Sequence, residues 1–260
     1  MPTMETLVLE RADNGVVTLT LNRPERKNAM NAAMFNELLG VFREVDASTT
    51  DRVLVITGAG DAFCSGADLS DRGSDTRHAM QRLHWVADIA LALHRIPKPV
   101  IAKVNGVAVG AGMNLALGCD LIVASEQARF SEIFARRGLT IDFGGSWLLP
   151  RLVGMHRAKE LALFADIISA KEAAEMGLVN RVVPAGELDA FVADWAKRLA
   201  AGPPIALGMT KRLLSNSFSM TMDEALEAEG LAQSVNSGTE DTAEAIRAFL
   251  DKREPKFKGR

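Results

Sequence analysis

Short apolar segments alternate with helical stretches over the first part of the chain. The apolar segments predicted as strands are residues 7–9, 16–21, 53–58, 100–104 and 121–124. Asp13-Asn14-Gly15 joins the first two with the Asn-Gly signal of a β-hairpin. Apolar residues at helical spacing follow Asn31, which is a suitable N-cap, and a second amphipathic helix is predicted over residues 78–96.

The order strand, glycine turn, helix and strand predicts an α/β protein in which helices cover a sheet. Beyond residue 158 the pattern becomes helical, apart from an extended stretch at residues 178–183. The predicted helices there are residues 158–165, 170–176, 188–200, 204–215, 222–237 and 239–252. A doubly wound dinucleotide fold is the generic alternative, but the chain contains neither G-x-G-x-x-G nor G-x-x-x-x-G-K-[ST].

The composition of the chain disfavours nucleic-acid-binding, membrane-bound and metal-binding proteins. The 260 residues are 48% hydrophobic, enough for a large core, and the net charge of −3 favours neither nucleic acid nor an acidic membrane as a partner. No apolar run is long enough to span a bilayer, and the N-terminus lacks a signal-peptide pattern, so we expect a cytoplasmic protein. Cys64 and Cys119 have no metal-ligand spacing, and no metal is expected.

Two glycine-rich segments and one aspartate carry the candidate chemistry. Residues 63–69 (FCSGADL) and 105–114 (NGVAVGAGMN) are small enough to bring a backbone N–H close to a ligand. The second segment opens a predicted helix, whose first N–H groups are unpaired. Two such donors on one ligand oxygen would form an oxyanion hole. Asp142, nearby in a Gly-Gly turn, could then move a proton.

Several motifs occur together in a diagnostic order. They are residues 22–30 (NRPERKNAM), 62–69, 98–102, 105–120, 138–154 and 169–179. In this order and spacing the chain resembles the crotonase superfamily, also called the enoyl-CoA hydratase/isomerase family, over nearly its whole length. The resemblance implies a spiral core of repeated ββα units, which we assign to residues 1–200, and a C-terminal helical trimerisation region at residues 201–260. It also implies an acyl-CoA thioester substrate and a homotrimer or hexamer. Coenzyme A would be part of the substrate, and no separate cofactor is expected.

The resemblance also assigns catalytic positions. The backbone N–H groups of Ala67 and Ala111 match the two oxyanion donors of the family. The two glutamates of its hydratases correspond to Asn114 and Phe134, neither of which accepts a proton at neutral pH. Glu132 lies two residues from the second position and would need a local shift to substitute.

Asp142 has two interpretations. Several isomerases of the superfamily have an aspartate before the same Gly-Gly pair, which favours Asp142 as the catalytic base. The alternative is a structural role, in which Asp142 is the N-cap of a helix over residues 144–149.

Further residues are expected to bind substrate. Arg26 and Lys27 are placed to meet the coenzyme A phosphates, and Phe249 and Lys252 match a C-terminal helix that touches a neighbouring subunit's coenzyme A in the family. The helix at residues 78–96, with His84 and Trp85, is expected to line the acyl pocket. The remaining candidates around the oxyanion segments and the pocket are Cys64, Gly66, Asp68, Leu69, Gly110, Asn114, Phe134 and Phe143. The last two would also exclude water.

The number of carboxylates favours one reaction over another. A double-bond shift through an enolate needs one shuttling base, whereas hydration also needs an activated water and suits two carboxylates. We therefore expect an enoyl-CoA isomerase that uses Asp142. The alternatives are a hydratase using Glu132 or waters held by Asn114, and a catalytically degenerate acyl-CoA-binding protein. Ser65 as a hydrolase nucleophile is disfavoured, because residues 64–66 lack the G-x-S-x-G elbow.

Overall fold

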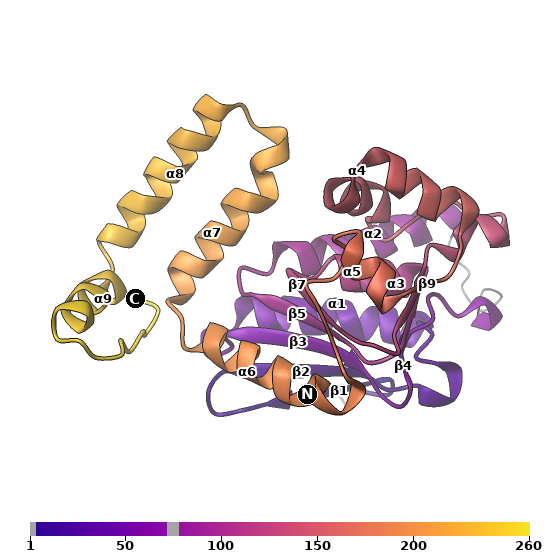
Figure 1. The fold of residues 1–260 in the computed structure, drawn as a ribbon, viewed down its shortest axis with the longest axis horizontal. Helices are drawn as coiled ribbons and strands as arrows, with labels where there is room; N and C mark the ends of the chain where they lie inside the picture. Colours follow the sequence, from indigo (N-terminus) through magenta and orange to yellow (C-terminus); the bar gives the residue numbers. More distant parts are fainter. Residues whose placement is uncertain (1–3, 72–77) are drawn as a thin grey trace.

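A computed structural model describes residues 4–71 and 78–260. The strands are β1 (Leu7–Arg11), β2 (Val16–Leu21), β3 (Val53–Gly58), β4 (Ala62–Cys64), β5 (Val100–Val104), β6 (Val107–Val109), β7 (Leu121–Ser125), β8 (Arg129–Ser131), β9 (Ile168–Ser169) and β10 (Arg181–Val183). The α-helices are α1 (Ala32–Ala47), α2 (Ala79–Arg95), α3 (Ala111–Leu117), α4 (Gly145–Phe164), α5 (Ala170–Glu175), α6 (Leu188–Ala200), α7 (Pro204–Asn216), α8 (Met222–Ser237) and α9 (Glu240–Leu250) (Figure 1). The predicted α/β class is confirmed.

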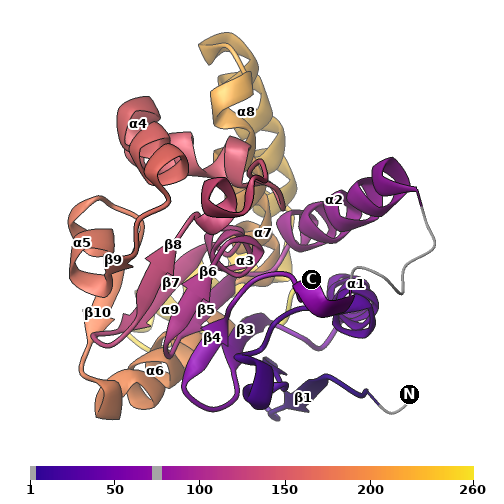
Figure 2. The same cartoon turned by 90° about the vertical axis from the view of Figure 1, so that its right-hand side faces the viewer.

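The larger sheet has six strands in the order β1-β2-β3-β5-β7-β10. The predicted hairpin is present, since β1 and β2 pair antiparallel, and the remaining pairs are parallel. Val53 and Val55 of β3 pack in a cluster with α6, whereas Leu54 and Ile56 point into the main core with α1, α2 and α3. Helices therefore cover both faces (Figure 2), which explains why every residue of β3 is buried.

A second sheet was not among the predicted elements. Its four short strands run in the order β4-β6-β8-β9, and each has only two or three residues. Such strands produce no recognisable alternation, and two of them lie inside the glycine-rich segments. Because β4 and β6 pair in parallel, the turns that follow them emerge at the same edge of the sheet.

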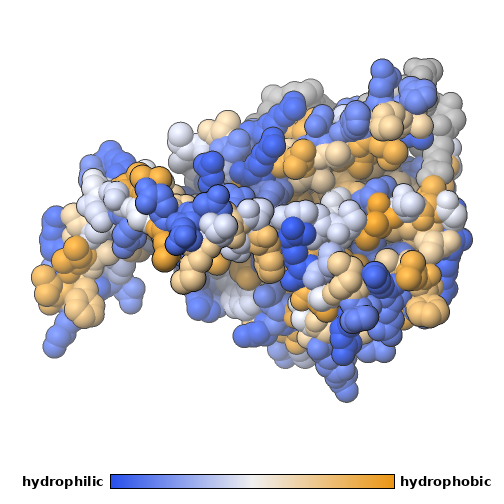
Figure 3. Space-filling model, turned by 90° about the horizontal axis from the view of Figure 1, so that it is seen from above, coloured by the Kyte–Doolittle hydropathy of each residue, from blue (hydrophilic) through white to orange (hydrophobic). Residues whose placement is uncertain are grey.

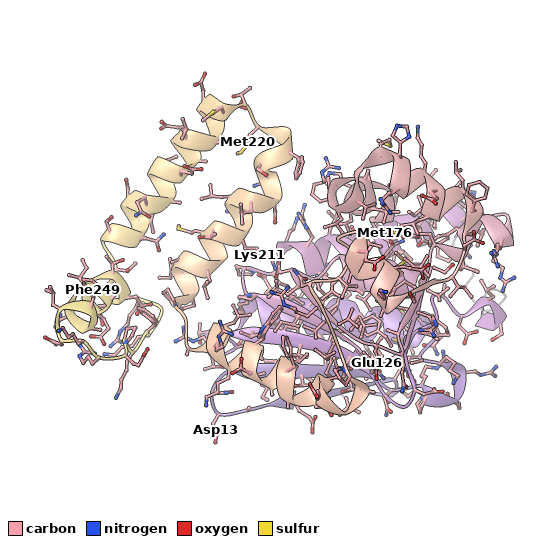
Figure 4. The ribbon with its side chains drawn as sticks, in the orientation of Figure 1. Asp13, Glu126, Met176, Lys211, Met220 and Phe249 are labelled. Carbon is pink, nitrogen blue, oxygen red and sulfur yellow. The ribbon has the colours of Figure 1, made fainter. Side chains whose placement is uncertain are left out.

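Residues 204–260, here called the arm, extend away from the sheets as the α7–α8 hairpin followed by α9 (Figure 1). Lys211 of α7, labelled in Figure 4, joins the arm to the core, because its Nζ lies 2.7 Å from the Asp120 carboxylate and 3.0 Å from the Lys98 carbonyl oxygen. Figure 3 shows hydrophobic surface on the arm as well as on the core. Exposed apolar side chains there include Leu214, Phe218, Leu226, Leu231 and Phe249.

The start of α4 corrects one alternative from the sequence. Gly144 is the N-cap of this helix, and no side chain caps it, so the N-cap interpretation of Asp142 is wrong. The backbone is non-helical at Gly154 (φ +77°, ψ 164°), so α4 consists of two helical parts joined at a kink, in agreement with the separate segments predicted from the sequence. Within residues 4–71 and 78–260, no helix combines the length and apolar character needed to cross a membrane.

Candidate active site

The two glycine-rich segments interlock through their backbones. A Cβ on Gly66, whose φ is +97°, would lie 2.9 Å from the carbonyl oxygen of Val109. A Cβ on Gly112 would lie 2.3 Å from the carbonyl oxygen of Cys64. Only glycine fits at these distances, so the turn after β4 and the start of α3 are in direct contact because of their composition.

This packing leaves the backbone N–H groups of Ala67 and Ala111 available to donate to a ligand oxygen. Met30 donates to the Gly66 carbonyl and accepts from the Asp68 N–H, both at 2.8 Å, and this bridge skips the N–H of Ala67. Ala111 is the first residue of α3, so its N–H has no acceptor within the helix. The Ala111 nitrogen lies 3.7 Å from the position of a Cβ on Gly66. The predicted donors thus belong to adjacent segments.

Asp142 and Ala67 line the same cavity of about 110 Å³, here called the reaction cavity. Its other walls come from α1, α2 and the segments before them, and include Met30, Asn31, Ala32, Phe35, Asp68, Arg82, Leu83, Trp85 and Val86. Ala111 is not among the lining residues and approaches it only through the contact with Gly66. Oδ1 of Asp142 is inaccessible to solvent.

The loop that carries Asp142 has an unusual backbone. Phe143 has φ of +50° and Gly144 has φ of +82°, and a left-handed conformation is uncommon for phenylalanine. The carbonyl oxygen of Asp142 accepts hydrogen bonds from the Gly145 N–H at 3.0 Å and from Nδ2 of Asn114 at 2.9 Å. A Cβ on Gly145 would lie 2.4 Å from the Asn114 amide. Asn114 therefore packs directly beneath the turn that positions Asp142.

Glu132 also belongs to this cluster. It is fully buried at the start of a 3-10 helix over residues 133–137, and its Oε2 accepts a hydrogen bond from Nδ2 of Asn114 at 3.3 Å. Burial and the charge of Asp142 together raise the pKa of Glu132 to about 8, although the hydrogen bond from Asn114 lowers it. The sequence feature that indicates a buried carboxyl here is a glutamate among the mainly apolar residues 130–134.

Phe134 is buried against the oxyanion segment. Its ring lies 3.7 Å from the position of a Cβ on Gly110, and Gly110 donates its N–H to the Ser131 carbonyl at 2.8 Å. Phe134 therefore fills, with apolar surface, the position that the resemblance assigned to a glutamate.

A larger cavity of about 460 Å³, here called the apolar cavity, lies beside the reaction cavity. Helix α2 and the loop before α4 contribute to both cavities: Val86 and Asp142 line the reaction cavity, whereas the next residues, Ala87 and Phe143, line the apolar cavity. The apolar cavity is lined by Ala87, Ala90, Leu91, Leu93, His94, Asn114, Gly118, Phe143, Gly144, Trp147 and Leu148.

Helix α2 contributes to both cavities, but through partly different residues from those expected. Trp85 lines the reaction cavity and stacks edge-on against Phe35, whereas His84 is exposed. His94 lines the apolar cavity, with its ring 5.4 Å from Trp147. Burial, together with the charge of Lys211, lowers the pKa of His94 and favours its neutral form.

The remaining residues near the oxyanion segments have structural contacts. The turn with Arg26 and Lys27 packs on this region, since the Ser65 N–H donates to the Lys27 carbonyl at 3.0 Å, and the Lys27 ammonium pairs with Asp61. Leu69 is exposed.

Asp68 and Cys64 have perturbed pKa values with structural causes. Hydrogen bonds from Ser70 and the ion pair with Arg23 at 3.0 Å lower the pKa of Asp68. Burial raises the pKa of the Cys64 thiol to about 12, so this cysteine is no activated nucleophile.

Phe249 and Lys252 do not approach Asp142 within one chain. They lie at the end of the arm, where Phe249 is 82% exposed (Figures 1 and 4). The tail beyond them returns to the core far from the cavities, with the Phe257 carbonyl accepting from Arg52 at 3.3 Å.

Comparison with known proteins gives consistent matches over the chain. A sequence model of the family described as enoyl-CoA hydratase/isomerase matches residues 11–260. The 1,2-epoxyphenylacetyl-CoA isomerase of Escherichia coli strain K12 is 39% identical and aligns over 99% of this chain and 100% of its own. The short-chain-enoyl-CoA hydratase of Clostridium acetobutylicum is 34% identical over 96% of both chains. Among solved structures, an enoyl-CoA hydratase from Bacillus anthracis superimposes with a TM-score of 0.93 at 34% identity, covering 98% of this chain and 100% of that one.

Proposed function

Because this chain belongs to the enoyl-CoA hydratase/isomerase family and acts on acyl-CoA, we propose that it is an isomerase that shifts a carbon–carbon double bond of an enoyl-CoA thioester. The observation that carries the proposal is that Asp142 and Ala67 line one cavity. Asp142 would move the proton, and the N–H groups of Ala67 and Ala111 would hold the thioester oxygen.

The proposed reaction balances without water. With a 3-enoyl-CoA, the Asp142 carboxylate takes a proton from C2, and the electron pair moves onto the thioester oxygen, where the two N–H groups stabilise it. The protonated Asp142 then returns the proton to C4. The double bond moves from C3–C4 to C2–C3, and the carboxylate is regenerated.

The same residues argue against the usual route to hydration. Asn114 and Phe134 occupy the positions of the two glutamates, and Phe134 is buried against Gly110. Neither side chain activates a water molecule. Phe143 adds a further apolar wall beside Asp142, which keeps water from the enolate.

The apolar cavity is the proposed place of the acyl chain beyond the reacting carbons. Its volume of about 460 Å³ suits a ring or a branched group as well as a straight chain. The name of the Escherichia coli relative refers to a phenylacetyl group, which makes ring-bearing thioesters a useful part of any substrate panel.

Two alternative functions are a hydratase that uses Glu132 and an acyl-CoA-binding protein without catalytic activity. A hydratase using Glu132 is favoured by the burial of that carboxyl next to Asn114. A catalytically degenerate acyl-CoA-binding protein would follow from the lost glutamates alone, but Asp142 in the reaction cavity disfavours it.

We also propose that the chain forms a homotrimer or hexamer through the arm, and that Phe249 and Lys252 meet coenzyme A bound to a neighbouring copy. The exposed Leu214, Phe218 and Leu231 supply apolar surface for this contact. Light scattering at micromolar concentration tests it, and a monomer would contradict it. A cytoplasmic location remains our expectation.

The reaction is tested by incubating the protein with 2-enoyl-, 3-enoyl- and ring-containing CoA thioesters and analysing products by mass spectrometry and NMR. Isomerisation leaves the mass unchanged and moves the vinyl resonances, whereas hydration adds one water. A product heavier by one water from every active substrate would reject the isomerase.

Calorimetry with a non-reactive acyl-CoA tests binding, and no binding at millimolar ligand would reject the acyl-CoA site.

A further inference from the structure

The buried Glu132 and Asn114 and the half-buried Asp142, which come from separate elements, form one hydrogen-bonded network next to the reaction cavity. Glu132 lies after β8, Asn114 on α3, and Asp142 in the loop before α4. Nδ2 of Asn114 donates both to Oε2 of Glu132, at 3.3 Å, and to the carbonyl oxygen of Asp142, at 2.9 Å. Asn114 and Glu132 are both 0% exposed.

The hydrogen-bonded group of Glu132, Asn114 and Asp142 has more acceptor atoms than donor hydrogens. Among the described residues, Oδ1 of Asn114 and Oε1 of Glu132 are buried without a hydrogen-bond partner. A carboxylate only accepts hydrogen bonds, whereas a carboxylic acid also donates one. A proton on Glu132 would therefore supply the missing donor and remove an uncompensated buried charge.

We propose that Glu132 is a positioning residue, which holds Asp142 in place through Asn114 and does so as the neutral carboxylic acid. The proposal rests on the isomerase function proposed above. It gives Glu132 a role distinct from proton transfer, because its contact with Asp142 runs through the Asn114 amide and the Asp142 peptide rather than through substrate.

In the part of the chain that the structure describes, no cation lies where it would stabilise the Glu132 anion. Helix α3 and the first turn of α4 contain no ionisable side chain. Arg136 and Arg137, on the 3-10 helix that follows Glu132, are exposed, and Arg136 pairs with Asp166. Arg129 of β8 is also exposed. Asp142 is the ionisable neighbour that acts on Glu132, and its charge disfavours a second anion.

Ionisation of Glu132 then affects catalysis. Burial raises its pKa to about 8, so the neutral form predominates at pH 7 and the anion above pH 8. A buried anion beside Asp142 repels the negative charge of the enolate and raises the barrier. We therefore expect turnover in the native protein to fall above about pH 8.

The experiment measures kcat and KM for a 3-enoyl-CoA from pH 6 to pH 10 in the native protein, Glu132→Gln and the exposed control Glu126→Gln. Glu132→Gln keeps a neutral amide in place of the acid. We expect its kcat at pH 7 to fall by no more than about tenfold, KM to change little, and the alkaline fall to disappear. Glu126→Gln should keep the native pH profile. An unchanged alkaline fall in Glu132→Gln would overturn the proposal.

A second measurement needs neither activity nor a variant that folds. In native protein with isotope-labelled glutamate carboxyl groups, NMR should show one glutamate carboxyl titrating near pH 8. If every glutamate carboxyl is ionised at pH 7, the neutral acid is rejected. Asp142→Asn separates this proposal from the isomerase itself, because it should lower turnover by at least ~10²-fold at every pH. The Glu132 carboxyl should still titrate above its ordinary pKa in this variant, because burial is the largest cause of the shift. If Glu132→Gln is inactive at every pH and Asp142→Asn is active, both proposals fail.

Discussion

Asn114 holds the backbone of Asp142, with its side-chain Nδ2 2.9 Å from the Asp142 carbonyl oxygen. The resemblance places a hydratase glutamate at position 114, where this chain has an amide that donates to the loop before α4. An amide can donate to this carbonyl, whereas a carboxylate cannot. Position 114 thus orients a loop, and the loop places the Asp142 carboxylate at the reaction cavity, which Asp68 also lines.

Asp142→Asn should lower isomerase turnover by at least ~10²-fold, the low end for loss of a general base. The amide has the same shape but accepts no proton, so acyl-CoA affinity and melting temperature should change little. Steady-state kinetics, calorimetry and thermal melting measure the three quantities. Full activity of this variant would remove Asp142 from the mechanism.

Gly145→Ala should destabilise the fold and weaken catalysis together. Its Cβ would lie 2.4 Å from the Asn114 amide, which is already held by Glu132 and Asp142. Forcing these groups apart should cost about 1–3 kcal/mol in the free energy of unfolding, measured by urea denaturation.

Gly40→Ala is the matched control, because a Cβ at that helical position meets nothing within 4 Å. It should stabilise α1 by roughly 0.5–1 kcal/mol. Equal stability of the two variants would show that Gly145 is not tightly packed against Asn114.

Glu132→Gln should change how stability depends on pH. The pKa of Glu132 is about 8 in the folded protein against 4.5 ordinarily. The folded chain therefore keeps a proton that the unfolded chain releases between these values. The stabilisation from this proton is complete below pH 4.5 and is lost as pH rises toward 8, by at most ~1.4 kcal/mol per pH unit.

The amide variant does not titrate, so its stability relative to the native protein should rise from about pH 5 to pH 8 and then level off. Urea denaturation at each pH measures this difference. A difference that stays constant with pH would mean that Glu132 has an ordinary pKa in the folded state.

Lys211→Ala should loosen the attachment of the arm. The Lys211 side chain is 13% exposed and pairs with Asp120 at 2.7 Å, while burial already raises the pKa of Asp120. Removing the ammonium leaves the Asp120 carboxylate, whose side chain is 27% exposed, without this partner. We expect a cost of about 1 kcal/mol in the free energy of unfolding, at the upper end for exposed pairs.

Lys171→Ala is the control for this ion pair. Lys171 and Glu175 are 3.9 Å apart and both largely exposed, so their loss should cost less than ~0.5 kcal/mol. Chemical denaturation compares the two variants. Costs of similar size would contradict a structural role for the Lys211 contact.

The sequence by itself determined the long elements and the candidate donors. Residues 16–21, 53–58 and 100–104 form strands at the predicted bounds, because short segments rich in β-branched and apolar residues favour strands. Residues 53–58 are buried throughout, whereas residues 16–21 alternate between buried and partly exposed positions. Asn31 caps α1 by accepting from the Met34 N–H, as its residue type predicts. These features depend on residues close in the chain, and a local pattern is enough to reveal them.

Only the tertiary structure decided how distant residues meet. The second sheet, whose strands have two or three residues, depends on pairing between segments that carry no periodic signal. The burial of Glu132 and its contact with Asn114 follow from packing α3 against the start of α4. Residue type places a carboxyl at position 132, but the surrounding low dielectric and the nearby Asp142 charge, which raise its pKa to about 8, exist only in the folded chain.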